Sequence, residues 1–79
     1  MQTQEAEQLK ALFGKNVRKF RKLRNLTQKQ LADLIDTDER SISNIERGIH
    51  APTFTRIVDL AFRLNVAEWQ LFYDWQKAE

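Results

Sequence analysis

The side chains of this 79-residue chain that are best suited to specific recognition lie between residues 39 and 47. At 100° per residue, the polar residues of this stretch gather on one side of a helix, opposite Ile42 and Ile45. The polar side carries Arg40, Ser43, Asn44 and Arg47. Guanidinium, hydroxyl and carboxamide groups in one row can form specific hydrogen bonds with another polar surface.

Residue types that carry out catalysis are scarce in the chain. There is no cysteine, and His50 is the only histidine. We find no carboxylate cluster and no glycine-rich phosphate loop, so the sequence indicates no enzyme, cofactor, metal site or small-molecule effector. His50 is expected in a loop, where a lone histidine is usually an ordinary surface residue.

Basic residues are concentrated in the first half of the chain, although the formal net charge is only +2. There is no aspartate or glutamate between residues 8 and 32. The basic residues of this stretch are Lys10, Lys15, Arg18, Lys19, Arg21, Lys22, Arg24 and Lys29. This asymmetry suits a surface that faces a polyanion, because each neutralised phosphate releases counterions. A solvated helix face with ordinary lysines is the alternative interpretation.

The elements that must position these side chains are all expected to be helices, because apolar residues recur at helical spacing. A first helix is predicted over about residues 5–24, and a capping box of Thr27 and Gln30 begins a second. Asp38 and Thr53 are suitable N-caps for a third and a fourth helix, and Gly48 ends the third. The side chains expected on inward faces are Leu9, Leu12, Phe13, Val17, Phe20, Leu23, Leu31, Ala32, Leu34, Ile35, Ile42, Ile45, Phe54, Ile57, Val58, Leu60, Ala61 and Leu64.

An aromatic segment over about residues 66–77 is expected to form a fifth helix. The sequence thus predicts an all-α five-helix bundle that makes one domain of residues 1–79. Four aromatic residues between positions 69 and 75 exceed what one small core can bury. We expect Trp69 and Phe72 in the core, and Leu71, Tyr73 and Trp75 in a homodimer interface. No apolar run approaches the roughly 20 residues of a membrane span, so we expect a cytoplasmic protein.

Residues 28–47 meet the requirements for two helices that cross at a steep angle through a short turn. Ala32 is small enough for a close crossing, and Asp36 in the turn tolerates a positive φ. Ile42 and Ile45 supply two buried apolar residues three positions apart. The stretch is therefore predicted to be a helix-turn-helix motif.

Three segments together resemble the phage-repressor and Cro-like family, also called the xenobiotic-response-element family. They are Leu-Thr-Gln-Lys-Gln-Leu-Ala at 26–32, Ser-Ile-Ser-Asn-Ile-Glu-Arg-Gly at 41–48, and Pro-Thr at 52–53. The resemblance covers residues 12–72 and implies a lambda-repressor-like DNA-binding domain. Members place the second helix of the motif in the major groove of duplex DNA.

By this resemblance Glu39, Arg40, Ser43 and Asn44 become the predicted base-contacting residues. Arg40 could hold the O6 and N7 atoms of a guanine, Asn44 could pair with an adenine, and Glu39 could accept from a cytosine amino group. Each assignment has a structural alternative. Glu39 can simply complement the helix dipole, and Ser43 can be an exposed small residue.

The resemblance also implies which residues touch phosphates and which support the recognition helix. The predicted phosphate contacts are Gln28, Lys29, Arg47, His50, Thr53 and Arg56. Arg21 and Glu46 correspond to an internal ion pair that joins the first helix to the recognition helix. The role implied for this pair is to orient the helix rather than to bind DNA.

The chain departs from the family pattern at both turns and in its last helix. Glycine is usual at the positions of Asn25 and Asp36, although both residues tolerate left-handed φ. Ala67 stands where a capping hydroxyl is expected, and Glu68 and Trp69 appear in exchanged order. The register of the last helix is accordingly the weakest part of the prediction.

The function that these features predict is that of a dimeric transcriptional regulator with a palindromic operator, which also controls its own promoter. Controller proteins of restriction–modification systems share this size, and they are the expected niche. A phage repressor and the antitoxin of a toxin–antitoxin pair are the alternatives of the same kind. A helical protein-interaction module without DNA binding is the alternative of another class.

Overall fold

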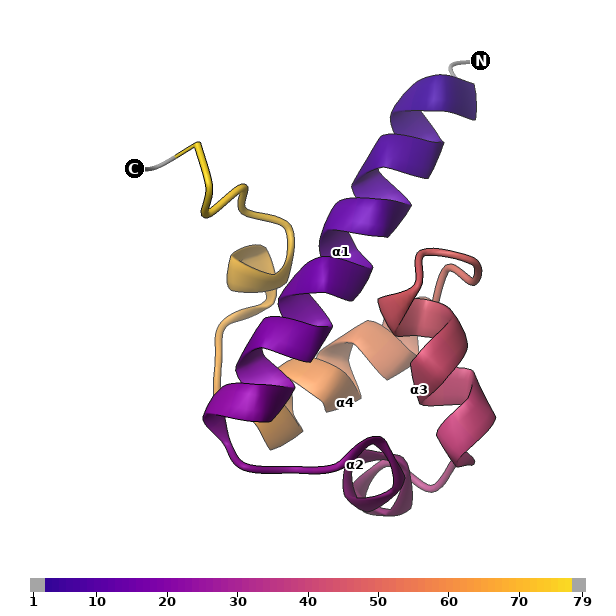
Figure 1. Cartoon of the computed structure of the whole chain (residues 1–79), viewed down its shortest axis with the longest axis vertical. Coiled ribbons are helices and arrows are strands. Elements are labelled where there is room, and N and C mark those ends of the chain that lie inside the picture. Colours follow the sequence, from indigo (N-terminus) through magenta and orange to yellow (C-terminus); the bar gives the residue numbers. More distant parts are fainter. Residues whose placement is uncertain (1–2, 78–79) are drawn as a thin grey trace.

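The computed structural model describes residues 3–77 and is helical in its regular parts (Figure 1). The elements are α1 (Thr3–Leu23), α2 (Gln28–Leu34), α3 (Glu39–Glu46), α4 (Phe54–Leu64) and a short 3-10 helix, η1 (Glu68–Leu71). The long helix α1 runs along the molecule, with α2 and α3 on one side and the C-terminal segment on the other (Figure 1). The all-helical prediction is confirmed, whereas the expected five-helix count is corrected to four α-helices and one 3-10 helix within the described residues.

Local sequence sets the start of each short helix. The Thr27 hydroxyl accepts from the Gln30 backbone N–H at 3.0 Å, and the Gln30 side chain accepts from the Thr27 N–H at 2.8 Å. An Asp38 carboxylate oxygen accepts from the Ser41 N–H at 2.8 Å, and the Thr53 hydroxyl caps α4 in the same way. Each bond satisfies a backbone donor that the first helical turn leaves without a partner, so the predicted caps are confirmed.

The turns use the left-handed backbone that the sequence predicted. Asn25 and Asp36 have φ values of 58° and 59°, and Asn65 ends α4 at 60°. Asparagine and aspartate adopt this conformation at a lower cost than most residues other than glycine. The two departures from glycine therefore leave both turns intact, and α2 and α3, which the Asp36 turn joins, meet at a steep angle (Figure 1).

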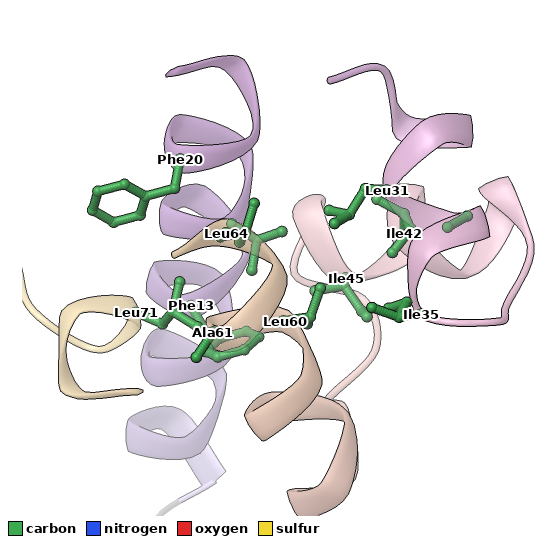
Figure 2. Close-up of a cluster of buried hydrophobic side chains, with 12 residues drawn as sticks. Phe13, Phe20, Leu31, Ile35, Ile42, Ile45, Leu60, Ala61, Leu64 and Leu71 are labelled. Atoms are coloured by element: carbon green, nitrogen blue, oxygen red, sulfur yellow. The ribbon is translucent and has the colours of Figure 1, made fainter. Parts of the chain in front are cut away.

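One core joins all the helices (Figure 2). Its buried apolar side chains are Phe13, Val17, Phe20, Leu31, Ala32, Ile35, Ile42, Ile45, Leu60, Ala61, Leu64 and Leu71. Several residues expected to face inward are instead largely exposed. These corrections concern Leu9, Leu23, Leu34, Phe54 and Val58, which lie at helix ends or on outward faces.

Gly14 lets α1 and α3 approach each other closely. A Cβ atom at this position would overlap the carbonyl oxygen of Ile45 and lie 2.9 Å from that of Glu46. The glycine costs about 1 kcal/mol of helix propensity relative to alanine, but it allows the two backbones to touch. The depth at which α3 sits on the molecule is thus fixed by one missing methyl group.

The last segment differs most from its prediction. Ala67 makes no side-chain cap, and only Glu68–Leu71 is helical. The buried amide of Asn16 donates to the carbonyl oxygens of Leu71 and Tyr73 at 2.8 and 2.9 Å. A continuing helix would need those carbonyls for its own hydrogen bonds, so the Asn16 contacts favour the turns seen here.

Candidate nucleic-acid interface

The recognition helix α3 is tied to the rest of the protein through Glu46. Its carboxylate accepts from the Arg21 guanidinium at 2.6 and 3.0 Å and from the Gln28 side-chain amide at 3.0 Å. Arg21 is buried and also donates to the Leu26 carbonyl at 2.8 Å. The paired hydrogen bonds between guanidinium and carboxylate are directional, so α1, α2 and α3 are held in one orientation.

A shallow polar depression of about 550 Å³ lies along the outer side of α3. We call the residues that line it the reading edge. They are Gln28, Glu39, Arg40, Ser43, Asn44 and Arg47. The structure thus brings all four predicted base-contacting residues together with two predicted phosphate contacts. Glu39, Arg40 and Arg47 are exposed, whereas Gln28, Ser43 and Asn44 are half-buried.

A second, smaller depression of about 250 Å³ continues from the reading edge. Arg40 and Asn44 line both, and His50, Thr53 and Arg56 line the second. Three more of the predicted phosphate contacts therefore lie next to the recognition helix.

Lys29 lies outside both depressions. Its ammonium is exposed and 3.6 Å from the Asp33 carboxylate one helical turn away. The structure therefore does not bring Lys29 into the reading edge, and its phosphate contact stays a prediction.

Gln28 and Arg56, both predicted phosphate contacts, also donate side-chain hydrogen bonds to other helices of the protein. The Gln28 amide nitrogen donates to Glu46, and the Arg56 guanidinium donates to the Ile35 carbonyl at 2.8 Å. These bonds fix both side chains where their remaining N–H groups can meet a ligand. Sequence reasoning missed this second role, because the Ile35 carbonyl becomes a neighbour of Arg56 only through the fold.

Sequence reasoning also missed Thr37 and Ser41, which line the second depression. Their positions on either side of the Asp38 N-cap were the available signal, and both side chains are half-buried. Hydrogen bonds from Ser41 lower the pKa of the Asp38 carboxyl from its ordinary value of 3.8, and Arg40 and Arg56 add a smaller electrostatic effect. Asp38 is therefore an anion at neutral pH, and it stabilises the start of α3.

Several of the basic residues in the first half of the chain have structural partners. Arg21 binds Glu46, and Arg24 donates to the Leu64 carbonyl at 2.9 Å. Lys10 pairs with Glu7 at 3.0 Å, and Lys19 lies 5.0 Å from the Trp75 ring centre. These four residues are therefore better explained by an ordinary helix face or by structural contacts than by a surface that faces phosphates.

The three residues predicted in the dimer interface differ in how deeply they are buried. Leu71 is completely buried in the core, so its assignment to an interface is wrong. Trp75 packs edge-on against Phe20 at 5.9 Å, and Tyr73 packs on Trp75 at 4.6 Å while staying 40% exposed. Trp69, expected in the core, is 60% exposed, because the shortened helix turns it outward.

None of the helices among the described residues combines the length and apolar character needed to cross a membrane.

Comparisons with known proteins identify the family to which the chain belongs. A family model described as helix-turn-helix matches residues 17–68. The control protein C.SmaI of Serratia marcescens is 32% identical over 59 residues, which are 75% of this chain and 70% of that protein.

Two solved structures share the fold of this chain. One is the restriction–modification controller protein C.AhdI of Aeromonas hydrophila, with a TM-score of 0.78 and 29% identity over 84% of this chain and 96% of that one. The other is the hypothetical transcription factor NHTF of Neisseria, with a TM-score of 0.82 and 32% identity over 91% of this chain and 84% of that one. The predicted resemblance is confirmed: this chain belongs to the helix-turn-helix family of DNA-binding transcriptional regulators and is not an enzyme.

Proposed function

We propose that the protein is a cytoplasmic homodimeric regulator that reads a palindromic operator through the DNA major groove. The observation that carries this proposal is the reading edge. It brings acidic, basic and neutral hydrogen-bonding side chains together along the exposed side of α3. The helix is held in position by the hydrogen bonds between Glu46 and Arg21 of α1. A major groove is wide enough for one α-helix, and side chains fixed in position can discriminate between bases.

Within this proposal the residues of the reading edge divide into two roles. Arg40 and Asn44 contact base edges, together with Glu39 and Ser43. Arg47 and Gln28 hold the DNA backbone, helped by His50, Thr53 and Arg56 in the second depression. Phosphate contacts position the helix, whereas base contacts carry the sequence information.

We further propose that the operator controls restriction–modification genes and the promoter of the regulator itself. This part is supported by the relatives C.SmaI and C.AhdI, whose names describe them as control and controller proteins. The similarity covers 70% of C.SmaI and 96% of C.AhdI, so it extends over most of each relative.

Selection of bound sequences from a random DNA pool tests the proposal. We expect a palindromic consensus for the native protein. Arg40→Ala should lose preference at one symmetric base position, at a cost of about 1–3 kcal/mol in binding free energy for the native operator. A consensus and affinity unchanged in Arg40→Ala would remove this residue from the base-contacting set.

Arg47→Ala is the matched control, because it removes an equal charge from the same helix. We expect it to keep the consensus but to weaken binding to all duplexes. The slope of log affinity against log salt should fall by about 0.9 per operator half-site. Equal, weak binding of the native protein to every duplex would contradict the proposed function.

A further inference from the structure

Helix α1 carries two exposed cations that form no ion pair within the described part of the chain. They are Arg18 and Lys22, which are four positions apart and therefore lie on one side of the helix. We call these two residues the basic ridge. Lys15 follows on the same side, but it lines a groove together with Glu5 and Asp74, so acidic side chains lie near it.

We propose that the basic ridge binds phosphates of duplex DNA that lie beside the bases contacted by the reading edge. The contact is additional to those of Gln28, Arg47 and the second depression. The inference deepens the proposed function and rests on it for the place of the contact relative to an operator. The contact itself needs only duplex DNA of any sequence.

One end of the reading edge meets the side of α1 that carries the basic ridge. A Cβ atom at Gly48 would lie 3.1 Å from the Ala11 Cα atom, and Gly48 directly follows Arg47 of the reading edge. Arg18 and Lys22 come seven and eleven positions after Ala11, which places each of them within about 20° of it around the helix. The ridge therefore continues the surface on which the reading edge ends.

The other connection between the two surfaces runs through Glu46. Lys22 directly follows Arg21, whose guanidinium donates to Glu46, and Glu46 also accepts from Gln28 of the reading edge. Because successive residues are turned by 100°, Arg21 faces α3 while Lys22 faces outward. The hydrogen bonds that hold α3 thus also fix the position of the ridge relative to the reading edge.

The ridge and the second depression border the reading edge from different helices. The second depression includes Thr53 and Arg56 at the start of α4, whereas the ridge belongs to α1. A helix in the major groove has a sugar–phosphate backbone on either side of it. Cations on both flanks of α3 can therefore meet one backbone each, and such contacts fix how the helix is oriented on the duplex.

The distribution of charge along α1 also suits DNA. There is no aspartate or glutamate between residues 8 and 32, so no carboxylate of this stretch opposes an approaching polyanion. Each phosphate that a cation neutralises releases counterions and adds affinity. The charge alone would suit any polyanion, and the position of the ridge beside the reading edge is what favours duplex DNA.

The salt dependence of binding tests the contact. Arg18→Gln and Lys22→Gln each remove one ridge charge and keep a residue that favours helix. We expect each variant to lower the slope of log affinity against log salt by about 0.9 per bound chain, with an unchanged consensus and unchanged helical circular dichroism.

Lys19→Gln is the matched control for both variants. Lys19 is an exposed cation next to Arg18, but it lies on another side of α1, 5.0 Å from the Trp75 ring centre. We expect its removal to leave the slope unchanged. A slope that falls equally in Lys19→Gln would overturn the inference, because the effect would then come from net charge alone.

Neutral methylphosphonate linkages, placed one at a time along the selected operator, locate the contact. We expect at least one linkage outside the bases read by α3 to weaken binding of the native protein by about 3-fold. The same linkage should have no effect on the Arg18→Gln or the Lys22→Gln variant, because the side chain that meets it is gone. A linkage that weakens the native protein and both variants equally would contradict the assignment.

The outcomes separate this inference from the proposed function. Equal slopes for the native protein and both ridge variants, as expected for a ridge that stays solvated or binds an acidic protein, would refute the ridge contact even where a palindrome is selected. Lowered slopes in both ridge variants of a protein that binds all duplexes equally would confirm the ridge contact and refute the palindromic operator.

Discussion

At the scale of single residues, Glu46 connects the scaffold to the reading edge. The carboxylate is almost entirely buried and accepts three hydrogen bonds from Arg21 and Gln28. A buried charge of this kind adds little stability in itself, because losing its hydration costs about as much as the pairing returns. The hydrogen bonds of Glu46 instead fix an orientation, because they align the first residue of α2 with the last turn of α3.

Removing one partner should therefore cost more than removing both. We expect Arg21→Met to lower the free energy of unfolding by about 3 kcal/mol, because Glu46 keeps a buried charge without its cation. The double variant Arg21→Met with Glu46→Met should recover most of this loss in urea denaturation. Operator affinity should stay reduced in the double variant, since Gln28 loses its anchor. Full recovery of affinity would show that the pair has no orienting role.

Asp38 gives the start of α3 a dependence on pH. Its pKa is lowered in the folded state, so the carboxylate contributes stability that is fully present above its ordinary pKa and lost as the pH falls through the folded-state value. Asp38→Asn keeps a capping oxygen without the charge. We expect the stability difference between the native protein and this variant to shrink from about pH 5 to about pH 2 in thermal denaturation.

The control for Asp38 is Asp59→Asn on the exposed side of α4, which removes a charge without touching a helix cap. A difference between Asp38→Asn and the native protein that stays constant over this pH range would contradict the assignment.

At the scale of elements, the packing of α1 against α3 rests on Gly14. Helix propensity alone predicts that Gly14→Ala stabilises α1 by about 1 kcal/mol. The overlap with the backbone of α3 predicts the opposite, because a backbone carbonyl cannot rotate away as a side chain can. We expect Gly14→Ala to lower the free energy of unfolding by about 3 kcal/mol in urea denaturation. It should also weaken operator binding by moving α3 outward.

Gly48 offers a comparison for Gly14, since its φ of 74° makes any substitution unfavourable for a different reason. A Cβ atom at position 48 would also lie 3.1 Å from the Ala11 Cα atom, and asparagine tolerates this φ better than alanine, so Gly48→Asn should lose less stability than Gly48→Ala. A stabilised Gly14→Ala would show that α1 and α3 are not in contact as described.

Elements with local stop and start signals could be predicted from the sequence. The Thr27 capping box and the Asp38 and Thr53 caps each depend on residues at most three positions apart. Part of the reading edge could be predicted too, because the 100° turn of one helix and the two inward isoleucines place Arg40, Ser43, Asn44 and Arg47 on one side, whereas Gln28 and Glu39 were assigned through the family resemblance. Such features are settled before any long-range contact forms.

Features that depend on distant contacts could not be predicted in the same way. The shortening of the last helix depends on Asn16, which lies 55 residues before Leu71 in the chain. Phe54 was expected to face inward because it shares the helical spacing of the apolar residues, but it is exposed. Apolar residues lie on both sides of α4, so their spacing alone could not show which side faces the core.

At the scale of the whole molecule, α1 is shared by two regions. One of its ends holds α2 and α3 through Arg21, and its middle holds the C-terminal segment through Asn16 (Figure 1). The C-terminal segment completes the core with Leu71, which no solvent reaches. A chain of this size buries only about 60–65% of its unfolded surface, so removing the C-terminal segment from the core should destabilise the whole domain.

Asn16→Leu tests whether the C-terminal segment can be released from the core without loss of operator binding. The variant leaves the carbonyls of Leu71 and Tyr73 without their donor, which should cost about 3 kcal/mol.

In a Trp69→Phe background, the fluorescence of Trp75 reports on the segment, because its indole N–H donates to the Gln70 carbonyl at 3.0 Å. We expect the Trp75 emission to shift to the red at lower urea than the loss of helical circular dichroism. At urea concentrations below the loss of helical circular dichroism, operator affinity should stay within about 3-fold of the native value, because the reading edge is held by Glu46 rather than by the C-terminal segment. Coincident transitions with an unchanged midpoint would mean that the Asn16 bonds do not hold the segment, and a collapse of affinity in native buffer would mean that the two regions are not separable.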